Sequence, residues 1–98
     1  MITRIFRAKV APDLHEEFRE KFKAISVPQV SSAKGLKSLC IGGPSRWNTE
    51  EFAMISVWEN EEALKEFAGE KWNKPYIPEG MEKYISECWL DHYEGIDF

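Results

Sequence analysis

The sequence predicts a single α+β domain of ferredoxin-like type, in which one antiparallel sheet of four strands carries two helices on one face. Three observations support this fold class. The chain has 98 residues, which is enough for one domain and too few for two. Apolar residues recur at strand and helix spacings in the order βαββαβ. Right-handed crossovers between such elements place both helices on the same side of one sheet.

The first expected strand runs from Ile2 to Val10, and a helix follows it. Apolar and polar residues roughly alternate in the strand, although Arg4 interrupts its apolar face. Asp13 lies three residues before Glu16, which is the spacing of a helix N-terminal capping box. Proline disfavours helical backbone in the residue before it, so Pro28 is expected to end the helix. The helix presents one apolar stripe, formed by Leu14, Phe18, Phe22 and Ile25.

Two strands and a second helix are expected next. A turn at Gly35 leads into a strand from Leu36 to Ile41, and a loop rich in Gly, Pro and Asn precedes the strand from Glu51 to Trp58. Asn60 is a good N-cap for the second helix, and Gly69 suits its end.

The last part of the chain alternates between a loop and a strand. Residues 70–80 contain two prolines and a glycine, so only a broken helical turn fits there. A fourth strand is expected from Tyr84 to Tyr93, followed by a short tail.

The strand from Glu51 to Trp58 is apolar on both faces, which has a consequence for assembly. Side chains alternate along a strand, so Met54, Ser56 and Trp58 point one way while three apolar side chains point the other. The helices can cover only one face, and an uncovered apolar sheet calls for a partner. We therefore expect a homodimer that pairs through the other face, at Ala53, Ile55 and Val57.

Composition narrows the function classes. The net charge of −4, from 17 acidic and 13 basic residues, disfavours nucleic acid as a partner. No apolar run reaches the length of a membrane span or a signal peptide, so we expect a soluble, cytoplasmic protein. The two cysteines, Cys40 and Cys88, are expected to be buried reduced thiols. The sequence contains no metal motif, no GxGxxG and no P-loop, so no metal, flavin or nicotinamide cofactor is expected.

Several short motifs together resemble the antibiotic biosynthesis monooxygenase family. The segment Ser56-Val57-Trp58-Glu59-Asn60-Glu61-Glu62-Ala63 is similar to the SxWxSxEA-type signature of that family. The opening Met1–Ile5, the Phe18…Phe22 pair, the closing His92–Gly95, and Trp72 followed by Ile77-Pro78 also fit. The resemblance implies a ferredoxin-like fold that dimerises through its sheets into an α+β barrel. It also implies oxygenation of phenols or quinols without metal or flavin, since characterised members do this.

Other members of the family degrade haem, and the sequence departs from their pattern. Those relatives resemble one another in an Asn on the first strand, the Trp of the signature, and a His on the second helix. Trp58 matches the Trp, but Ile2 to Val10 contains no Asn, and no His lies between Trp58 and His92. Haem degradation is therefore not expected.

Cofactor-free oxygenation needs an aromatic-walled pocket, a proton acceptor and donors that hold an anion. Trp58, Ser56, Met54 and Phe22 are the candidate pocket residues, with Trp58 alternatively serving as plain core. Trp72 and Tyr76 are either a lid over the pocket or an anchor for their loop.

The polar candidates His92 and Arg4 each have two alternative roles, and the base that would accept the substrate proton is not identified. His92 is either a titrating group near neutral pH or a surface residue at a strand end. Arg4 either anchors an anionic substrate or forms a cross-strand ion pair. His15 is expected to face solvent, because it lies beside the apolar stripe. A non-catalytic dimeric module that binds a small apolar ligand is the alternative function.

Overall fold

The computed structural model describes residues 1–75 and 77–98 and confirms the predicted α+β fold. One sheet contains four antiparallel strands in the order β2-β3-β1-β4, with β2 and β4 at its edges. The strands are β1 (Ile2–Val10), β2 (Leu36–Gly42), β3 (Glu51–Trp58) and β4 (Ile85–Glu94). β3, the strand predicted to carry both pocket residues and the dimer contact, is therefore one of the two central strands.

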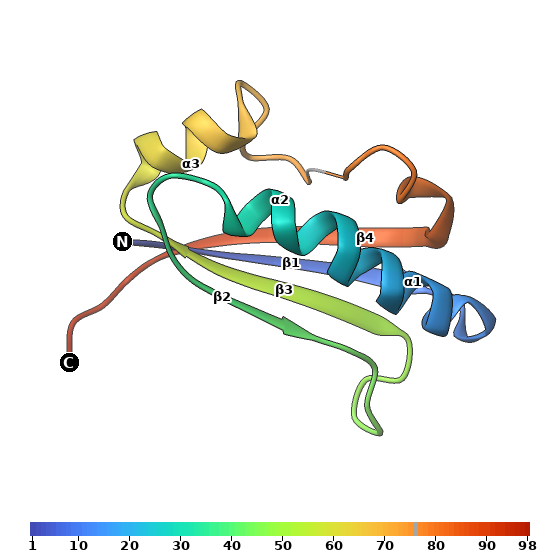
Figure 1. Ribbon diagram of the computed structural model, residues 1–98. Coiled ribbons are helices and arrows are strands. Elements are labelled where there is room, and N and C mark those ends of the chain that lie inside the picture. Colours follow the sequence, from blue (N-terminus) through green and yellow to red (C-terminus); the bar gives the residue numbers. More distant parts are fainter. Residues whose placement is uncertain (76) are drawn as a thin grey trace.

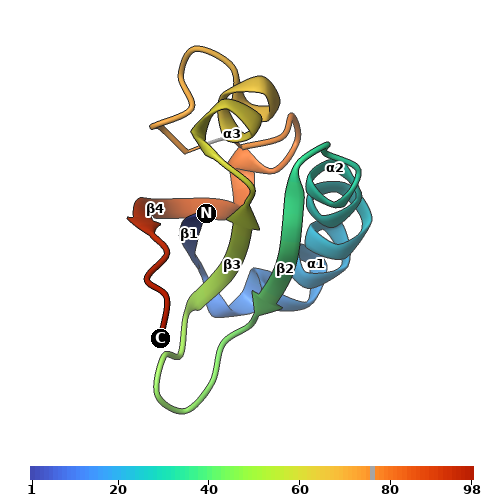
Figure 2. The ribbon, with the colours of Figure 1, turned by 90° about the vertical axis from the view of Figure 1, so that its left-hand side faces the viewer.

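The helices lie together on one face of this sheet, and the opposite face is open (Figures 1 and 2). The first helical stretch joins four short pieces, namely η1 (Pro12–Leu14), α1 (His15–Lys21), η2 (Phe22–Ser26) and α2 (Val27–Ser31). The second helix is α3 (Glu61–Ala68), and a short turn, η3 (Glu82–Tyr84), precedes β4. No helix in the described ranges is long and apolar enough to cross a membrane.

Pro28 does not end the first helix, and this prediction was wrong. The helical path continues to Ser31, with Pro28 near the start of α2. One π-helical turn lies immediately upstream, where the Val27 amide donates to the Phe22 carbonyl. A π turn adds a residue per turn. We attribute the continuation to this wider turn, which removes the demand for the amide proton that Pro28 lacks.

The predicted signals at the ends of α3 are confirmed. Asn60 accepts a hydrogen bond from the backbone amide of Ala63 at 2.8 Å, and so satisfies one free donor of the first turn. Gly69 follows the last residue with φ of 79°, a conformation that glycine adopts without strain. Gly35, at the predicted turn before β2, has φ of 90°, and an added Cβ would lie 2.5 Å from that of Ala63. The start of β2 therefore packs directly against α3.

The core lies between the helices and the covered face of the sheet. Phe18 packs against Phe22, Phe52 and Tyr84, with ring centroids 4.6–5.8 Å apart. Burying one large apolar side chain contributes about 1.5–3 kcal/mol, so this cluster is a main source of stability. Its fully buried members are Trp58, Phe18, Phe52, Leu64, Met81 and Val10.

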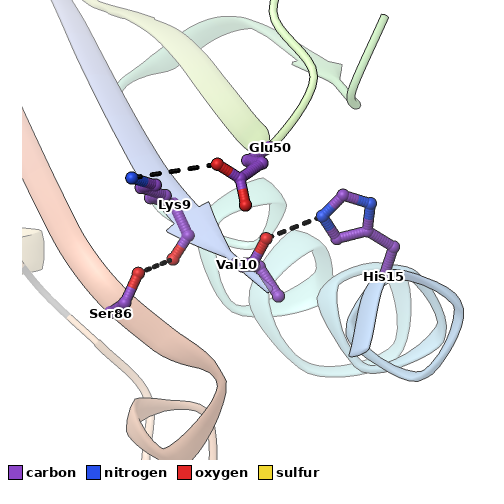
Figure 3. A network of polar contacts seen from close by, with 5 residues as sticks. All are labelled: Lys9, Val10, His15, Glu50 and Ser86. Carbon is purple, nitrogen blue, oxygen red and sulfur yellow. Dashed lines mark hydrogen bonds and ion pairs between the residues drawn. The ribbon is translucent and has the colours of Figure 1, made fainter. Parts of the chain in front are cut away.

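The end of β1 is fastened by polar contacts to the elements on either side (Figure 3). The His15 Nε2 donates to the Val10 carbonyl at 2.7 Å, while the Ser86 hydroxyl donates to the Lys9 carbonyl at 3.1 Å. Lys9 also lies 3.8 Å from the Glu50 carboxylate. His15 is half-buried, with its ring edge against Phe52 at 5.4 Å, so the expectation of a solvent-facing side chain was wrong.

The open face of the sheet carries the apolar side chains that the strand pattern predicts there. Ile55 is 37% exposed and lies opposite Ile5 on β1 and Cys40 on β2. Ala53 and Val57 are half-buried on the same face. The cysteines were predicted to be buried, which was wrong, because both belong to edge strands: Cys40 is exposed and Cys88 is partly exposed.

Candidate functional site

Two small adjoining cavities lie between the helices and the covered face of the sheet. Each has a volume of about 30 Å³. Three side chains, those of Phe6, Val30 and Met54, line both cavities and so form the wall between them. The two cavities are therefore neighbours that these three side chains separate.

The first cavity is apolar and aromatic. Phe18 and Phe22 stack at 5.3 Å and form one wall, while Ile77, Pro78 and Met81 close the opposite side. The π turn that begins at Phe22 belongs to this wall, and Gln29 reaches the cavity from the helix beyond it. Such walls suit the ring system of an aromatic ligand.

The second cavity is built on β3. Ser56 and Trp58 are two residues apart, so both side chains point to the covered face. The Trp58 indole Nε1 donates to the Ser56 hydroxyl at 2.9 Å, and its ring lies 5.1 Å from that of Phe67. Trp58 is completely buried and Ser56 is 3% exposed. This hydrogen bond fixes the indole orientation and supplies the partner that a buried indole N–H requires.

Arg4 supplies the charge at the second cavity. The side chain is only 6% exposed, and its Nη1 donates to the Trp72 carbonyl at 2.7 Å. The Nη2 lies 3.5 Å from the Lys74 carbonyl. None of the described carboxylates is within ion-pairing distance of Arg4, so the expected cross-strand ion pair was wrong. The reason is the register, which places His92 rather than an acidic residue opposite Arg4 on β4.

The contact between Arg4 and His92 fixes the state of the imidazole. The Arg4 Nη1 lies 3.3 Å from the His92 Nε2. A guanidinium only donates, so the Nε2 must accept, which leaves the proton of a neutral imidazole on Nδ1. Burial and the nearby Arg4 charge both lower the pKa of His92, in agreement with that state. Burial also lowers the pKa of Arg4, to about 10, which still leaves it charged at neutral pH.

Trp72 lies outside the two cavities. The Trp72 ring packs edge-on with the His92 ring, with the centroids 5.2 Å apart. The ammonium of Lys65, on α3, lies 5.5 Å from the centroid of the Trp72 ring. Tyr76, the second residue of the predicted lid, is outside the described residues. His92 is half-buried on the covered face, beside the site rather than in its walls.

Four predicted residues thus line the cavities: Phe22 and Met54 in the first, and Met54, Ser56 and Trp58 in the second. The sequence analysis missed Phe6 and Phe67, although their positions on the apolar stripes of β1 and α3 give a usable signal. It had no signal for the link between Arg4 and Trp72, which are 68 residues apart.

Comparison with known proteins shows which family the chain belongs to. Residues 1–71 match the family model described as antibiotic biosynthesis monooxygenase. The chain belongs to the antibiotic biosynthesis monooxygenase family. No curated protein sequence matches the chain.

Solved structures agree with the family assignment at the level of the fold. A candidate antibiotic biosynthesis monooxygenase of Nitrosomonas europaea has a TM-score of 0.76 and 17% identity, over 99% of this chain and 100% of that one. A similar candidate from Deinococcus radiodurans has a TM-score of 0.74 and 10% identity, over 100% and 95%. A variant of MhuD that binds two manganese protoporphyrin IX molecules per active site has a TM-score of 0.74 and 17% identity, over 100% and 97%.

The cavity walls of this family member do not fit a haem. The described residues that line the two cavities include no histidine, cysteine or tyrosine, and methionine, present there as Met54 and Met81, serves haem iron as a ligand together with a histidine. The haem-degrading pattern has a histidine on the second helix, and the corresponding helix of this chain, α3, contains none.

Proposed function

We propose that the protein is a cofactor-independent monooxygenase of a small phenolic or quinol-like aromatic substrate. The observation that carries the proposal is the pair of neighbouring cavities, one with aromatic walls and the other with a buried guanidinium. Membership of the antibiotic biosynthesis monooxygenase family supports the reaction type.

The proposed reaction converts a phenol and O₂ into a quinone and water. The phenol first loses its proton, and the phenolate gives one electron to O₂, which yields a phenoxyl radical and superoxide. These radicals combine to form a carbon–oxygen bond. The peroxide then takes up a proton and its O–O bond breaks. Loss of water leaves a quinone that keeps one oxygen atom. The hydrogens of the phenol and of the attacked ring carbon leave in the water.

Arg4 is positioned to stabilise the phenolate. A charged donor in a water-poor site stabilises a developing anion far more than it would in bulk water. His92 is the base in this proposal, because a neutral imidazole is able to accept the phenolic proton. Its Nε2 lone pair faces Arg4 in the structure. The guanidinium therefore has to move away from Nε2 before this nitrogen can accept the phenolic proton. In the proposal, the developing phenolate attracts the guanidinium to itself.

We further propose that the working unit is a homodimer that pairs through the open face. Ala53, Ile55 and Val57 lie on that face, where Ile5 pairs with Ile55, and Arg7 lies over the Trp89 ring at 5.1 Å. An obligate interface of this kind buries about 2,000 Å² or more in total. Its formation would close the uncovered side of the sheet.

Oxygen uptake with a panel of hydroquinones and anthrone-like phenols tests the oxygenase. The buffer contains a chelator, and the matched variants are His92→Gln and Arg4→Met. We expect uptake in the wild type and a loss of at least tenfold in both variants. A wild type that binds these compounds without consuming oxygen would favour the alternative, a non-catalytic binding module. Activity that requires one added metal would contradict the cofactor-free reaction.

A further inference from the structure

The buried charge of Arg4 has no counter-charge among the described residues. Its polar partners there are two backbone carbonyls and a neutral imidazole. Ion pairs among the described residues involve four other basic side chains: Arg7, Lys9, Lys23 and Lys65. An unpaired buried charge is expensive, so its persistence points to a partner that is present only part of the time.

The walls of the site indicate what that partner looks like. Among the described lining residues of both cavities, only Arg4 is charged. The apolar cavity on the other side of Met54 and Phe6 has Phe22 and Met81 among its walls. One end of the site therefore favours a negative oxygen, and the rest favours an apolar ring body.

The small size of the cavities means that a ligand with fused rings has to occupy both of them. A ligand with a fused ring system cannot occupy either space of about 30 Å³ alone. Met54 lines both spaces, and methionine is the most adaptable apolar side chain. Movement of Met54 would join the two spaces along the line from Arg4 to Phe22.

We propose that the site selects aromatic acids, with a carboxylate on the guanidinium of Arg4 and the ring system between Phe22 and Met81. This inference rests on the proposed function in that it uses the same site, and it specifies the substrate class. The carboxylate neutralises Arg4 in the ground state, whereas a neutral phenol offers a negative charge only after its proton has left. Substrates that carry the hydroxyl on the ring carbon next to the carboxylate fit best, because both oxygens then lie at the same guanidinium.

Binding of matched naphthalene probes to the full chain, measured by calorimetry without oxygen, tests the proposal. The probes are 2-naphthoate and 2-naphthamide, which have nearly the same shape but differ in charge. We expect the wild type to bind the acid about 10- to 100-fold more tightly, because the charged guanidinium then meets a carboxylate instead of a neutral amide oxygen. Equal affinities for acid and amide in the wild type would overturn the proposal without any variant.

Two variants locate the effect. Arg4→Met removes the guanidinium but keeps an unbranched side chain that can pack, and it is expected to abolish the preference for the acid. Arg46→Met removes an exposed arginine of the loop before β3 and is expected to retain it. A preference that survives Arg4→Met in folded protein would place the anion elsewhere and refute the assignment. A third probe, 2-naphthol, separates a carboxylate site from a phenolate site: binding as tight as that of the acid would contradict the carboxylate assignment.

The outcomes separate this inference from the proposed function. Preference for the acid without oxygen uptake on any hydroxylated acid would retain the inference and reject the oxygenase. Oxygen uptake on neutral phenols, with no preference for the acid, would retain the oxygenase and reject the inference.

Discussion

The hydrogen bond between Trp58 and Ser56 allows a quantitative test of how the site is held. Trp58 is completely buried and donates to Ser56, which is 3% exposed, at 2.9 Å. Removal of a large buried aromatic group, as in Trp58→Ala, costs about 3–5 kcal/mol. Domains of this kind have a total unfolding free energy of about 5–15 kcal/mol. Trp58→Ala is therefore expected to sit at the edge of unfolding and is a poor probe of activity.

A double-mutant cycle avoids this problem. Ser56→Ala leaves the indole N–H buried without a partner, which costs about 1–3 kcal/mol. Trp58→Phe removes that N–H together with one ring. In the double variant no N–H is left unsatisfied, so its loss of stability should be smaller than the sum of the single losses. We expect a coupling of about 0.5–3 kcal/mol.

Urea unfolding measures these free energies, provided that the slope against urea is the same for all four proteins. Activity or binding is then compared only among variants that remain folded at the assay temperature. Single losses that add to within about 0.3 kcal/mol would refute the reasoning, because independent sites behave in that way. Trp58 would then be an ordinary core residue whose N–H finds another partner.

Three further outcomes follow from the structure. Ile55→Asp, on the open face, should convert the proposed dimer into a monomer or an aggregate, because two carboxylates would enter a dry interface. A wild type that sediments as a monomer at micromolar concentration would contradict the proposed dimer. Burial and the Arg4 charge lower the pKa of His92, so the unfolded chain binds a proton there more readily than the folded protein. The free energy of unfolding should therefore be highest above about pH 6.5 and fall below it. Urea unfolding at several pH values measures this dependence, which His92→Gln should weaken. Asn60→Ala should lower the unfolding free energy by about 1 kcal/mol through loss of the N-cap bond to Ala63, whereas Asn60→Asp should retain most of it.

Local signals in the sequence predicted the fold well. β3 begins and ends where its apolar pattern does, and α3 begins after Asn60 and ends before Gly69, because caps and periodicity act over a few residues. The end of the first helix was mispredicted at Pro28, since a π turn compensates for the missing amide proton and leaves no clear mark in the sequence.

The site was predictable only in part, for a similar reason. Met54, Ser56 and Trp58 follow from alternation along one strand. The surroundings of Arg4 do not, because its partners lie 68 to 88 residues away, and the strand register alone brings His92 opposite it. Long-range pairing decides whether a charge inside an apolar strand is paired with an acid or left without one.

The way in which residues 69–75 are attached has a consequence for how the protein opens. In the part of the chain that the structure describes, their backbone hydrogen bonds run within the segment or back to α3, as from Trp72 to Gly69 and from Lys74 to Lys71. The strands, in contrast, are joined by continuous ladders. Side-chain contacts from Arg4 and His92 hold the segment to the sheet. Its local unfolding should therefore require much less free energy than unfolding of the domain, and its amide protons should exchange with solvent long before those of β1. A ligand that takes the Arg4 guanidinium from these carbonyls would lower that local free energy further, although its binding to the folded protein would raise the melting temperature of the domain.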